Sequence, residues 1–374
     1  MKEQEFQIEH IDPLGQGVSK IGDKILFVRK TLPGETGLAQ ITKSSKGVHF
    51  GYPKNLTTTS EKRIEPDCPH FSECQGCHLL HTDYQSEIEF KAETLKKDLQ
   101  KMTSLKKETP VNIIAAPNRL GYRTRIQLHY DKAQGKMGFV DPTLNKIIPV
   151  PNCKIASPPI TEKLKELYQD KNWQKSASAK GHLEIAEAPT GEILITHNRS
   201  YSAGGFRQVF PAMNQELIKL IDQQINAISD QSDQELVVWD LFGGSGNLTQ
   251  NLKKQKIAVA DSFIPKHKYG GHQDFYTIDL FADESYEEFQ SKLLKNFTKP
   301  DILIIDPPRS GFKELANWAK RSKPKWIFYV SCHHATQLRD MAPLIGDYEL
   351  VDLHLLDFFP STFHFETLAC LKRS

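Results

Sequence analysis

The sequence predicts a multidomain α/β protein: an N-terminal OB-like β-barrel in residues 1–58, a central α+β domain in residues 59–200 and a C-terminal Rossmann-like domain in residues 201–374. Three observations lead to this prediction. Short apolar runs separated by glycine turns fill the first part, three cysteines lie close together at the start of the second, and strands alternate with helices through the third. A chain of 374 residues is also too long for one ordinary domain.

The composition is typical of a soluble globular protein, with 39% hydrophobic and 25% charged residues. The sequence contains no apolar run long enough to span a bilayer, and its start, MKEQEFQIEH, lacks the apolar core of a signal peptide. We therefore expect a cytoplasmic protein with no membrane partner. A formal net charge of +2 permits nucleic-acid binding without requiring it.

The first part has the pattern of a small closed barrel. Residues 25–28 form one of its short apolar runs, and Gly22 and Gly34 lie in two of its turns. OB-type barrels with this pattern commonly bind nucleic acid. Six basic residues are candidate phosphate contacts, and each fits a solvated surface charge equally well: Lys20, Lys24, Arg29, Lys30, Lys43 and Lys46.

Three cysteines, Cys68, Cys74 and Cys77, stand at C-x5-C-x2-C spacing, which favours a metal site in a chain without secretion signals. A fourth ligand must come from elsewhere in the chain, and Cys153 is the available candidate. Four thiolates suit either zinc or a [4Fe–4S] cluster, and ligand identity does not separate them. Three histidines are alternative zinc ligands or packing residues: His70, His78 and His81.

The rest of the central part mixes helices with strands. Residues 83–102 have the apolar periodicity of a packing helix. The C-terminal domain is one candidate surface on which a helix over residues 83–103 would pack. Strand-like segments lie at 126–130 and 192–196, with a helical stretch at 161–170. Four residues are candidates for lining an RNA groove by phosphate contact and base stacking: Arg119, Tyr122, Arg123 and Arg125. The alternative for the three arginines is a structural role in salt bridges.

The C-terminal part alternates helices and strands. A helix is expected over residues 211–228, and a buried strand over 236–240 enters a glycine turn at 242–247. Further strands are expected over 257–260 and 302–305. This alternation predicts a parallel sheet wound in the Rossmann manner, in which ligands bind at the carboxyl ends of the strands.

Cys332 follows a run of aromatic and β-branched residues at 326–330, and helical periodicity returns at 335–345. The thiol is therefore expected at the carboxyl end of a strand and beside a helix N-terminus. Because that end of a helix favours negative charge, we expect the thiol to be partly thiolate at neutral pH. The alternative for a lone cysteine at this place is a buried, inert thiol.

The glycine turn has the features of a nucleoside site. Gly244 lets the backbone approach a ligand, and Asp261, at the end of the next strand, can accept hydrogen bonds from both ribose hydroxyls. The stretch DLFGGSGN lacks the third spaced glycine of the dinucleotide fingerprint and the GK[ST] of a phosphate-binding loop. Followed by IDPPR, which contains Asp306, it points to S-adenosylmethionine.

The chain resembles the RNA uracil-5-methyltransferase family in six ordered stretches: CPHFSECQGC, GFRQVFPAMN, DLFGGSGNLT, IDPPRSG, YVSCHHATQLRD and HFETLACL. The N-terminal stretch GQGVSKIGDKILFVRKTLPGE resembles the TRAM module, an OB-like RNA-binding barrel. The resemblance covers nearly the whole chain. It implies a monomeric enzyme that transfers a methyl group from S-adenosylmethionine to C5 of a uridine in RNA, with 23S ribosomal RNA favoured and transfer RNA as the alternative substrate.

The resemblance also implies roles for individual residues. Cys332 matches the nucleophile that adds to C6 of uracil, and Glu366 matches the base that removes the C5 proton. Asp306 matches a residue between cofactor and uracil, with Arg309 beside it. Cofactor-lining positions are matched by Gln208, Phe242, Asn247, Asp261 at the ribose and Asp279 near the adenine. The four cysteines, Cys68, Cys74, Cys77 and Cys153, match ligands of a [4Fe–4S] cluster that is structural or positions RNA.

The chain departs from the resembled family at three places. His333 and His334 replace Asn and Pro after the nucleophile, and Phe210 replaces the Asn that usually follows Gln-Val. The segment between Asp261 and Asp279 is too short for a full crossover helix and strand. These departures motivate a rival hypothesis, a TRAM-type RNA-binding protein whose methyltransferase core has decayed. A cluster-dependent redox or radical enzyme is a third alternative.

Overall fold

The computed structural model of the protein describes residues 2–102, 109–141, 145–175, 178–199, 207–293, 297 and 299–374. Three features named above fall outside these residues: the predicted domain boundary at 200 and 201, position 103 of the predicted helix, and the first two residues of GFRQVFPAMN. No helix among the described residues is long and apolar enough to cross a membrane.

The chain forms two compact units. The first unit comprises Met1–Thr94, Asn118–Ala203 and Phe359–His364, and the second comprises Leu95–Pro117, Gly204–Phe358 and Phe365–Ser374. The expected barrel and most of the expected central domain therefore fall in one unit, and their separation at residue 58 stays a prediction.

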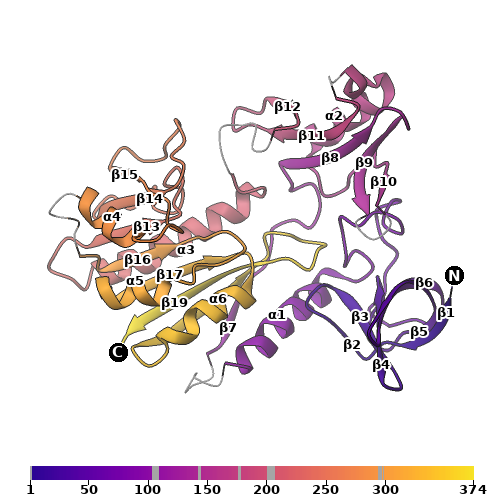
Figure 1. The fold of residues 1–374 in the computed structure, drawn as a ribbon, viewed down its shortest axis with the longest axis horizontal. Helices are drawn as coiled ribbons and strands as arrows, with labels where there is room; N and C mark the ends of the chain where they lie inside the picture. The colour runs from indigo at the N-terminus through magenta and orange to yellow at the C-terminus, as the bar shows by residue number, and fades with distance from the viewer. Residues whose placement is uncertain are drawn as a thin grey trace. The chain divides into compact units, whose positions relative to one another are not determined.

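A six-stranded sheet occupies the N-terminal part of the first unit, drawn in indigo and purple in Figure 1. Its order is β1-β5-β6-β4-β3-β2, and the expected run at 25–28 lies in β4. The apolar core comprises Phe6, Ile8, Leu26, Val28 and Ala39. The strands are β1 (Glu3–Gln7), β2 (His10–Ile11), β3 (Gln16–Ile21), β4 (Lys24–Arg29), β5 (Thr36–Ser45) and β6 (Val48–Thr58).

A second sheet of the first unit has the order β10-β9-β8-β11-β12. Helix α2 (Pro158–Asp170) begins with two prolines, ends where Lys171 adopts the left-handed conformation, and buries Ile160, Leu164 and Leu167 at helical spacing. The short helix η1 (Asn172–Lys175) follows it. The strands are β8 (Arg125–Asp131), β9 (Lys136–Asp141), β10 (Lys146–Ile148), β11 (Lys180–Glu187) and β12 (Ile193–His197).

Helix α1 (Tyr84–Gln100) begins after Asp83, whose carboxylate accepts a hydrogen bond from the backbone N–H of Ser86 at 2.8 Å. The division between the two units falls within this helix, after Thr94. The first unit also contains the segment 359–364 from near the C-terminus. The carbonyl of Ser361 in that segment accepts hydrogen bonds from the backbone N–H groups of His78 and Leu79.

The second unit contains an eight-stranded sheet of order β15-β14-β13-β16-β17-β19-β18-β7. The five strands from β15 to β17 are parallel, while β19 runs antiparallel to β17. Residues Ile302 to Ile305 are completely buried, as expected of a central parallel strand covered on both faces. The strands are β7 (Val111–Ile114), β13 (Val237–Leu241), β14 (Lys256–Asp261), β15 (Gln273–Thr277), β16 (Ile302–Ile305), β17 (Trp326–Ser331), β18 (Tyr348–Leu356) and β19 (Glu366–Arg373).

The helices of this unit follow the expected alternation, and Figure 1 shows α5 and α6 beside the sheet. Helix α3 (Pro211–Ser229) matches the helix expected at 211–228, and α6 (His334–Met341) with η3 (Ala342–Leu344) matches the helical pattern at 335–345. Helices α4 (Ser285–Lys292) and α5 (Leu315–Ser322) also lie in this unit.

The segment between Asp261 and Asp279 contains only one of the two elements of a full crossover. It contains a parallel strand, β15, paired with β14. Residues 262–272, which the structure describes throughout, form no helix. The prediction that the segment is too short for a full crossover helix together with a strand is therefore confirmed, and eleven loop residues return the chain to the sheet edge instead.

Candidate active site

The predicted cofactor and catalytic residues of the second unit gather at one edge of its sheet. Phe242, Asp306 and Cys332 directly follow β13, β16 and β17, and Asp261 is the last residue of β14. These four strands are parallel neighbours, so their carboxyl ends lie side by side. The sequence motifs therefore meet where an open α/β sheet binds its ligands.

The glycine turn after β13 leaves space beside Asp261. The backbone N–H of Gly244 donates to Oδ2 of Asp261 at 3.0 Å, and Gly244 has a φ of +54°. A Cβ placed on Gly244 would have only that oxygen within 4.0 Å, so the space beside the turn is open. Phe242 also adopts a positive φ, 61°, a conformation that costs free energy for a side chain of this size. The turn therefore has the shape of a cradle for a ligand.

Asn247, at the end of the glycine turn, pairs with Asn214 in the first turn of α3. The two side-chain amides exchange hydrogen bonds of 2.9 and 3.0 Å. This pair joins the DLFGGSGN and GFRQVFPAMN stretches, and Gln208 lies three residues before α3 begins. The sequence alone did not assign a role to Asn214.

Asp261 and Asp279 share a local arrangement that the sequence analysis missed. Oδ1 of Asp261 accepts the backbone N–H of Phe263, and Oδ1 of Asp279 accepts that of Phe281, each at 3.1 Å. Both phenyl rings are exposed, Phe263 by 64% and Phe281 by 55%. The repeated Asp-x-Phe pattern was the available signal. The ring of Phe242 lies 5.3 Å from that of Phe281, so aromatic surface borders the glycine turn.

The strand pairing brings Cys332 and Glu366 close together. Ser331, the residue before Cys332, is the register partner of Thr367, the residue after Glu366. The hydroxyl of Thr367 donates to the carbonyl oxygen of Ser331 at 3.1 Å and to Oε1 of Gln337 at 2.9 Å. The predicted nucleophile and base thus lie at the ends of two adjacent antiparallel strands.

Charge interactions connect the three predicted catalytic residues. Burial raises the pKa of Glu366 well above its usual value, the charge of Asp306 adds to this effect, and Arg309 opposes it. Burial raises the pKa of Asp306 to about 7, with further contributions from Asp240 and Asp261. Burial also raises the pKa of Cys332 to about 11, and the charges of Glu366 and Asp306 add to this, while Arg309 lowers it as a cation and hydrogen-bond donor.

The expectation that Cys332 is partly thiolate at neutral pH is therefore wrong for the protein alone. The thiol does lie beside the N-terminus of α6. Burial removes water from the sulfur, and the carboxyl groups of Glu366 and Asp306 repel a negative charge there. Together these effects outweigh the stabilisation of a thiolate by the helix N-terminus. Burial thus favours the protonated forms of Cys332 and Glu366.

Asp240 was not singled out from the sequence, although it lies in the DLFGGSGN stretch. It is completely buried, and its Oδ2 accepts a hydrogen bond from the hydroxyl of Thr249 at 2.8 Å. Burial raises its pKa to about 7, and the charge of Asp261 adds to this. The charge of Asp261 thus raises the pKa of Asp240, and the charges of both raise that of Asp306. This group of acidic side chains favours binding of a positively charged group.

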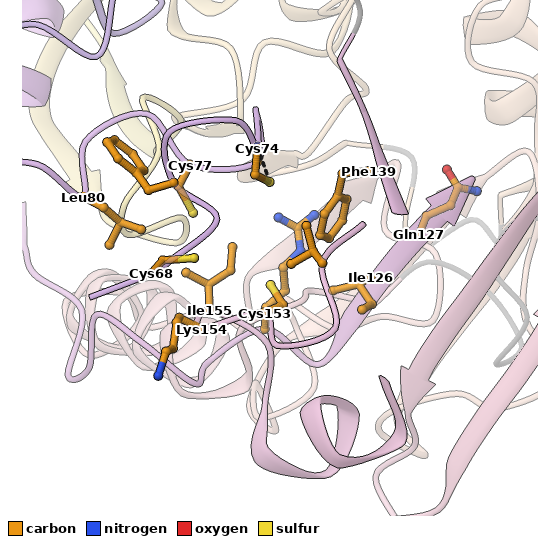
Figure 2. Close-up of a pocket in the computed structure, with 14 residues that line it drawn as sticks. Cys68, Cys74, Cys77, Leu80, Ile126, Gln127, Phe139, Cys153, Lys154 and Ile155 are labelled. Atoms are coloured by element: carbon orange, nitrogen blue, oxygen red, sulfur yellow. Dashed lines mark hydrogen bonds between the residues drawn. The ribbon is translucent and has the colours of Figure 1, made fainter. Parts of the chain in front are cut away.

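The four predicted metal-binding cysteines line one cavity in the first unit (Figure 2). The cavity measures about 230 Å³, and Cys68, Cys74, Cys77 and Cys153 all border it, together with Arg123. Burial raises the pKa of Cys74, Cys77 and Cys153, and their mutual repulsion as thiolates adds to the effect. As they stand, no three His, Cys, Asp or Glu side chains among the described residues are arranged to bind a metal ion. Four cysteine sulfurs around one cavity nevertheless fit a metal ion or cluster that is held by four thiolate ligands.

The sequence comparisons point in the same direction as this geometry. Residues 276–374 match the model of the tRNA (Uracil-5-)-methyltransferase family. The 23S rRNA (uracil(1939)-C(5))-methyltransferase RlmD of Shewanella woodyi is 26% identical over 436 residues, covering 99% of this chain and 96% of the relative. That of Vibrio parahaemolyticus is 25% identical, covering 100% of this chain and 97% of the relative. The chain is thus similar over almost its full length to RNA (uracil-5-)methyltransferases, and its C-terminal part matches the model of that family.

A solved structure shares the fold of this chain over almost its full length. The tRNA (uracil-54, C5)-methyltransferase of Pyrococcus abyssi, in complex with S-adenosyl-L-homocysteine, superposes with a TM-score of 0.70 at 20% identity. The match covers 98% of this chain and 99% of the archaeal one. The region matched by the family model includes Asp306, Cys332 and Glu366.

Two of the candidate phosphate contacts, Lys30 and Arg29, have other partners in the first unit. Lys30 donates to the carbonyl oxygens of Phe71 and Ser72 and, at 2.8 Å, to that of Cys74. Burial lowers its pKa to about 8. Arg29 donates to Oε1 of Gln75 at 3.0 Å. Both residues therefore stabilise the cysteine segment, and the ammonium of Lys30 already donates to three backbone carbonyl oxygens.

The structural interpretation also holds for two of the residues considered for an RNA groove. Arg119 forms an ion pair with Glu87 at 2.8 Å and donates to the carbonyl of Leu79 at 2.7 Å. Tyr122 is buried, and its hydroxyl donates to the carbonyl of Pro360 at 3.0 Å. Arg123 lies at the cysteine cavity.

The alternative zinc ligands His78 and His81 act as packing residues. The ring of His81 is completely buried and stacks on Phe71, and the ring of His78 contacts Phe363. Burial lowers the pKa of both histidines to about 3.

Proposed function

We propose that this protein transfers a methyl group from S-adenosylmethionine to C5 of a uridine in RNA through a covalent intermediate. The observation that supports this most strongly is the position of Cys332 and Glu366 at the ends of paired strands, beside Asp306. A thiol, a carboxyl group and a cofactor cradle at one sheet edge are the parts that this reaction needs.

The chemistry requires a nucleophile because uracil C5 is too weak to attack a methyl group directly. In the proposed reaction the thiolate of Cys332 forms a bond to C6, and the electron pair of the C5–C6 double bond moves to C5. C5 then forms a bond to the methyl carbon, and the bond between that carbon and sulfur breaks. Glu366 removes the C5 proton, the double bond forms again, and the bond from C6 to Cys332 breaks.

Both Cys332 and Glu366 must lose a proton before they can act, because burial favours their neutral forms in the protein alone. Bound S-adenosylmethionine would supply the methyl group and, as a sulfonium, a positive charge. Arg309 donates a hydrogen bond to the sulfur of Cys332 and thereby stabilises the thiolate that attacks.

The cofactor would bind at the glycine turn. Gly244 leaves open space beside Asp261. Asp261 would face the ribose hydroxyls, and Asp279 would lie near the adenine. Phe242, Asn247 and Gln208 would line the remainder of this site, and Asp306 would lie between cofactor and uracil.

We favour 23S ribosomal RNA as the substrate because the RlmD relatives match the chain almost from end to end. The archaeal neighbour is named for a transfer RNA substrate, so transfer RNA is the alternative. Either substrate is consistent with a cytoplasmic monomer whose N-terminal TRAM-like barrel contributes RNA binding.

The cysteine cavity would bind a [4Fe–4S] cluster through Cys68, Cys74, Cys77 and Cys153. Methyl transfer involves no net electron transfer, so we assign the cluster a structural or RNA-positioning role. Protein purified without oxygen should contain iron and sulfide and absorb broadly near 400 nm, a typical range for such clusters. Cys153→Ser should lose both, whereas Cys370→Ser, in the buried core of the second unit, should not. Stoichiometric zinc without iron would contradict this assignment.

The test of the proposed activity is a covalent trap. RNA containing 5-fluorouridine has no C5 proton to remove, so the reaction should stop at an adduct between RNA and Cys332 that survives denaturation. Wild-type protein with S-adenosylmethionine should form this adduct with 23S ribosomal RNA transcripts, and transfer RNA transcripts run in parallel decide between the substrates. Tight RNA binding with no adduct from either RNA would instead support the decayed RNA-binding protein.

A further inference from the structure

We propose that His334 is a positioning residue for this reaction, which aligns Cys332 with Glu366 by contacting Asp98 and Phe365 at the same time. This inference rests on the proposed roles of Cys332 and Glu366. His334 itself touches neither the reacting atoms nor, in our account, the cofactor.

The contacts of His334 connect three separate segments of the second unit. Its Nε2 lies 2.8 Å from Oδ2 of Asp98, near the end of α1. Its ring stacks on that of Phe365, with centroids 5.0 Å apart and planes inclined by 14°. His334 is the second residue after Cys332, and Phe365 is the residue before Glu366. One side chain thus contacts the segments that carry the nucleophile and the base.

The backbone around Cys332 depends on side-chain contacts of this kind. His333 accepts the N–H of Thr336 through Nδ1 at 3.3 Å, and the N–H of His333 donates to the hydroxyl of Ser331 at 3.1 Å. The resembled family has proline at position 334, where a fixed φ would limit the backbone. In this chain the limit comes from the bond between His334 and Asp98, which anchors the first residue of α6.

The electrostatic surroundings favour a neutral imidazole that donates to a carboxylate. His334 faces the carboxylate of Asp98 and the stacked ring of His333. The other carboxylate oxygen of Asp98, Oδ1, lies 2.6 Å from the ammonium of Lys101. Burial lowers the pKa of His334, and Asp98 opposes this effect. Only 14% of the His334 side chain is exposed, so water competes little for the bond.

The experiment compares rates of adduct formation by Cys332 in a single turnover, with saturating 5-fluorouridine RNA and S-adenosylmethionine. His334→Ala and Asp98→Ala should each slow adduct formation roughly tenfold or more, without a change in the affinity for RNA or cofactor. The double variant should be no slower than the slower single variant, because both changes remove the same contact. His334→Gln, which keeps a donor for Asp98, should recover part of the rate.

A matched control is available in the same unit. His354 forms an equivalent pair with Asp352, 2.7 Å apart, in β18, away from the nucleophile. His354→Ala should lower the free energy of unfolding without slowing adduct formation. If His334→Ala does not fold, His334→Gln and Asp98→Asn provide the comparison.

The outcomes separate this inference from the proposed function. No adduct from wild-type protein would overturn the proposed function, and this inference with it. An unchanged rate in His334→Ala and Asp98→Ala, or an equal slowing by His354→Ala, would overturn the positioning role alone and leave the covalent mechanism intact.

Discussion

Ser331 and Thr367 face each other across β17 and β19, and the Thr367 hydroxyl donates to the Ser331 carbonyl oxygen at 3.1 Å. This pairing fixes the register of two strands that meet only once the chain has turned through α6, η3 and β18. Cys332 follows one partner and Glu366 precedes the other, so the register of this strand pair determines whether thiol and carboxyl can act on one base.

Thr367→Val tests this role of the pair. Valine keeps the shape and strand preference of threonine but removes the hydroxyl that bonds to Ser331 and Gln337. Because both partners are buried, we expect the free energy of unfolding in urea to fall by about 1–3 kcal/mol. We also expect kcat to fall with little change in KM. Thr277→Val, at an exposed position of β15, is the control and should change neither quantity.

The raised pKa of Cys332 predicts slow alkylation at neutral pH. Iodoacetamide reacts with the thiolate. The alkylation rate of Cys332 should therefore rise about tenfold for each increase of one pH unit, until the pH reaches the pKa of about 11. In Glu366→Gln the nearby carboxyl charge is absent, and the rate at alkaline pH should be higher than in wild type. Mass spectrometry of the peptide that contains Cys332 measures both rates. Fast alkylation at pH 7 that no longer changes with pH would contradict this account.

Asp240→Asn should change how stability depends on pH. Burial raises the pKa of Asp240 to about 7 in the folded protein, so between about pH 4 and 7 the folded state binds the proton more tightly than the unfolded state. This residue therefore makes the wild type less stable as the pH rises through that range, by up to about 4 kcal/mol. Asparagine carries no such charge. Urea unfolding at pH 5 and pH 7.5 should show a smaller loss of stability for the variant than for the wild type.

Gly244→Ala should weaken cofactor binding. Gly244 has a positive φ, and its missing side chain leaves the space beside Asp261 open. Gly346→Ala is a matched control, because Gly346 also has a positive φ and open space but lies in the turn before β18. Both variants should lose roughly 1 kcal/mol of stability. In calorimetry with S-adenosylhomocysteine, only Gly244→Ala should bind more weakly, and equal affinity losses would argue against this location of the cofactor.

The sequence predicted the strands and helices whose pattern is strong and local. Ile302 to Ile305 form a fully apolar run that ends at Asp306, and the helix from Pro211 has apolar residues at helical spacing. Both elements appear where they were expected. Strand β15 was missed because Gln273 to Thr277 mix polar and aromatic residues in a segment without other strand signals.

The site could be predicted by residue but not by its electrostatics. Motifs located Cys332, Asp306 and Asp261, yet the pKa of Cys332 depends on side chains from two other segments, at 306–309 and 366, that no local pattern brings together. The contact between His334 and Asp98 joins residues 236 positions apart and could not be read from either neighbourhood. The sequence could not predict the contacts of Lys30 either, because its hydrogen bonds depend on the fold of the cysteine segment.

The most direct measurement of the central claim uses RNA that carries tritium at C5 of uridine. Wild-type protein should release tritium to water in step with methyl transfer, because Glu366 removes the C5 proton after Cys332 has activated the ring. Glu366→Gln should transfer the methyl group, remain covalently attached to the RNA and release no tritium. Tritium release or methyl transfer by Cys332→Ala would contradict the mechanism.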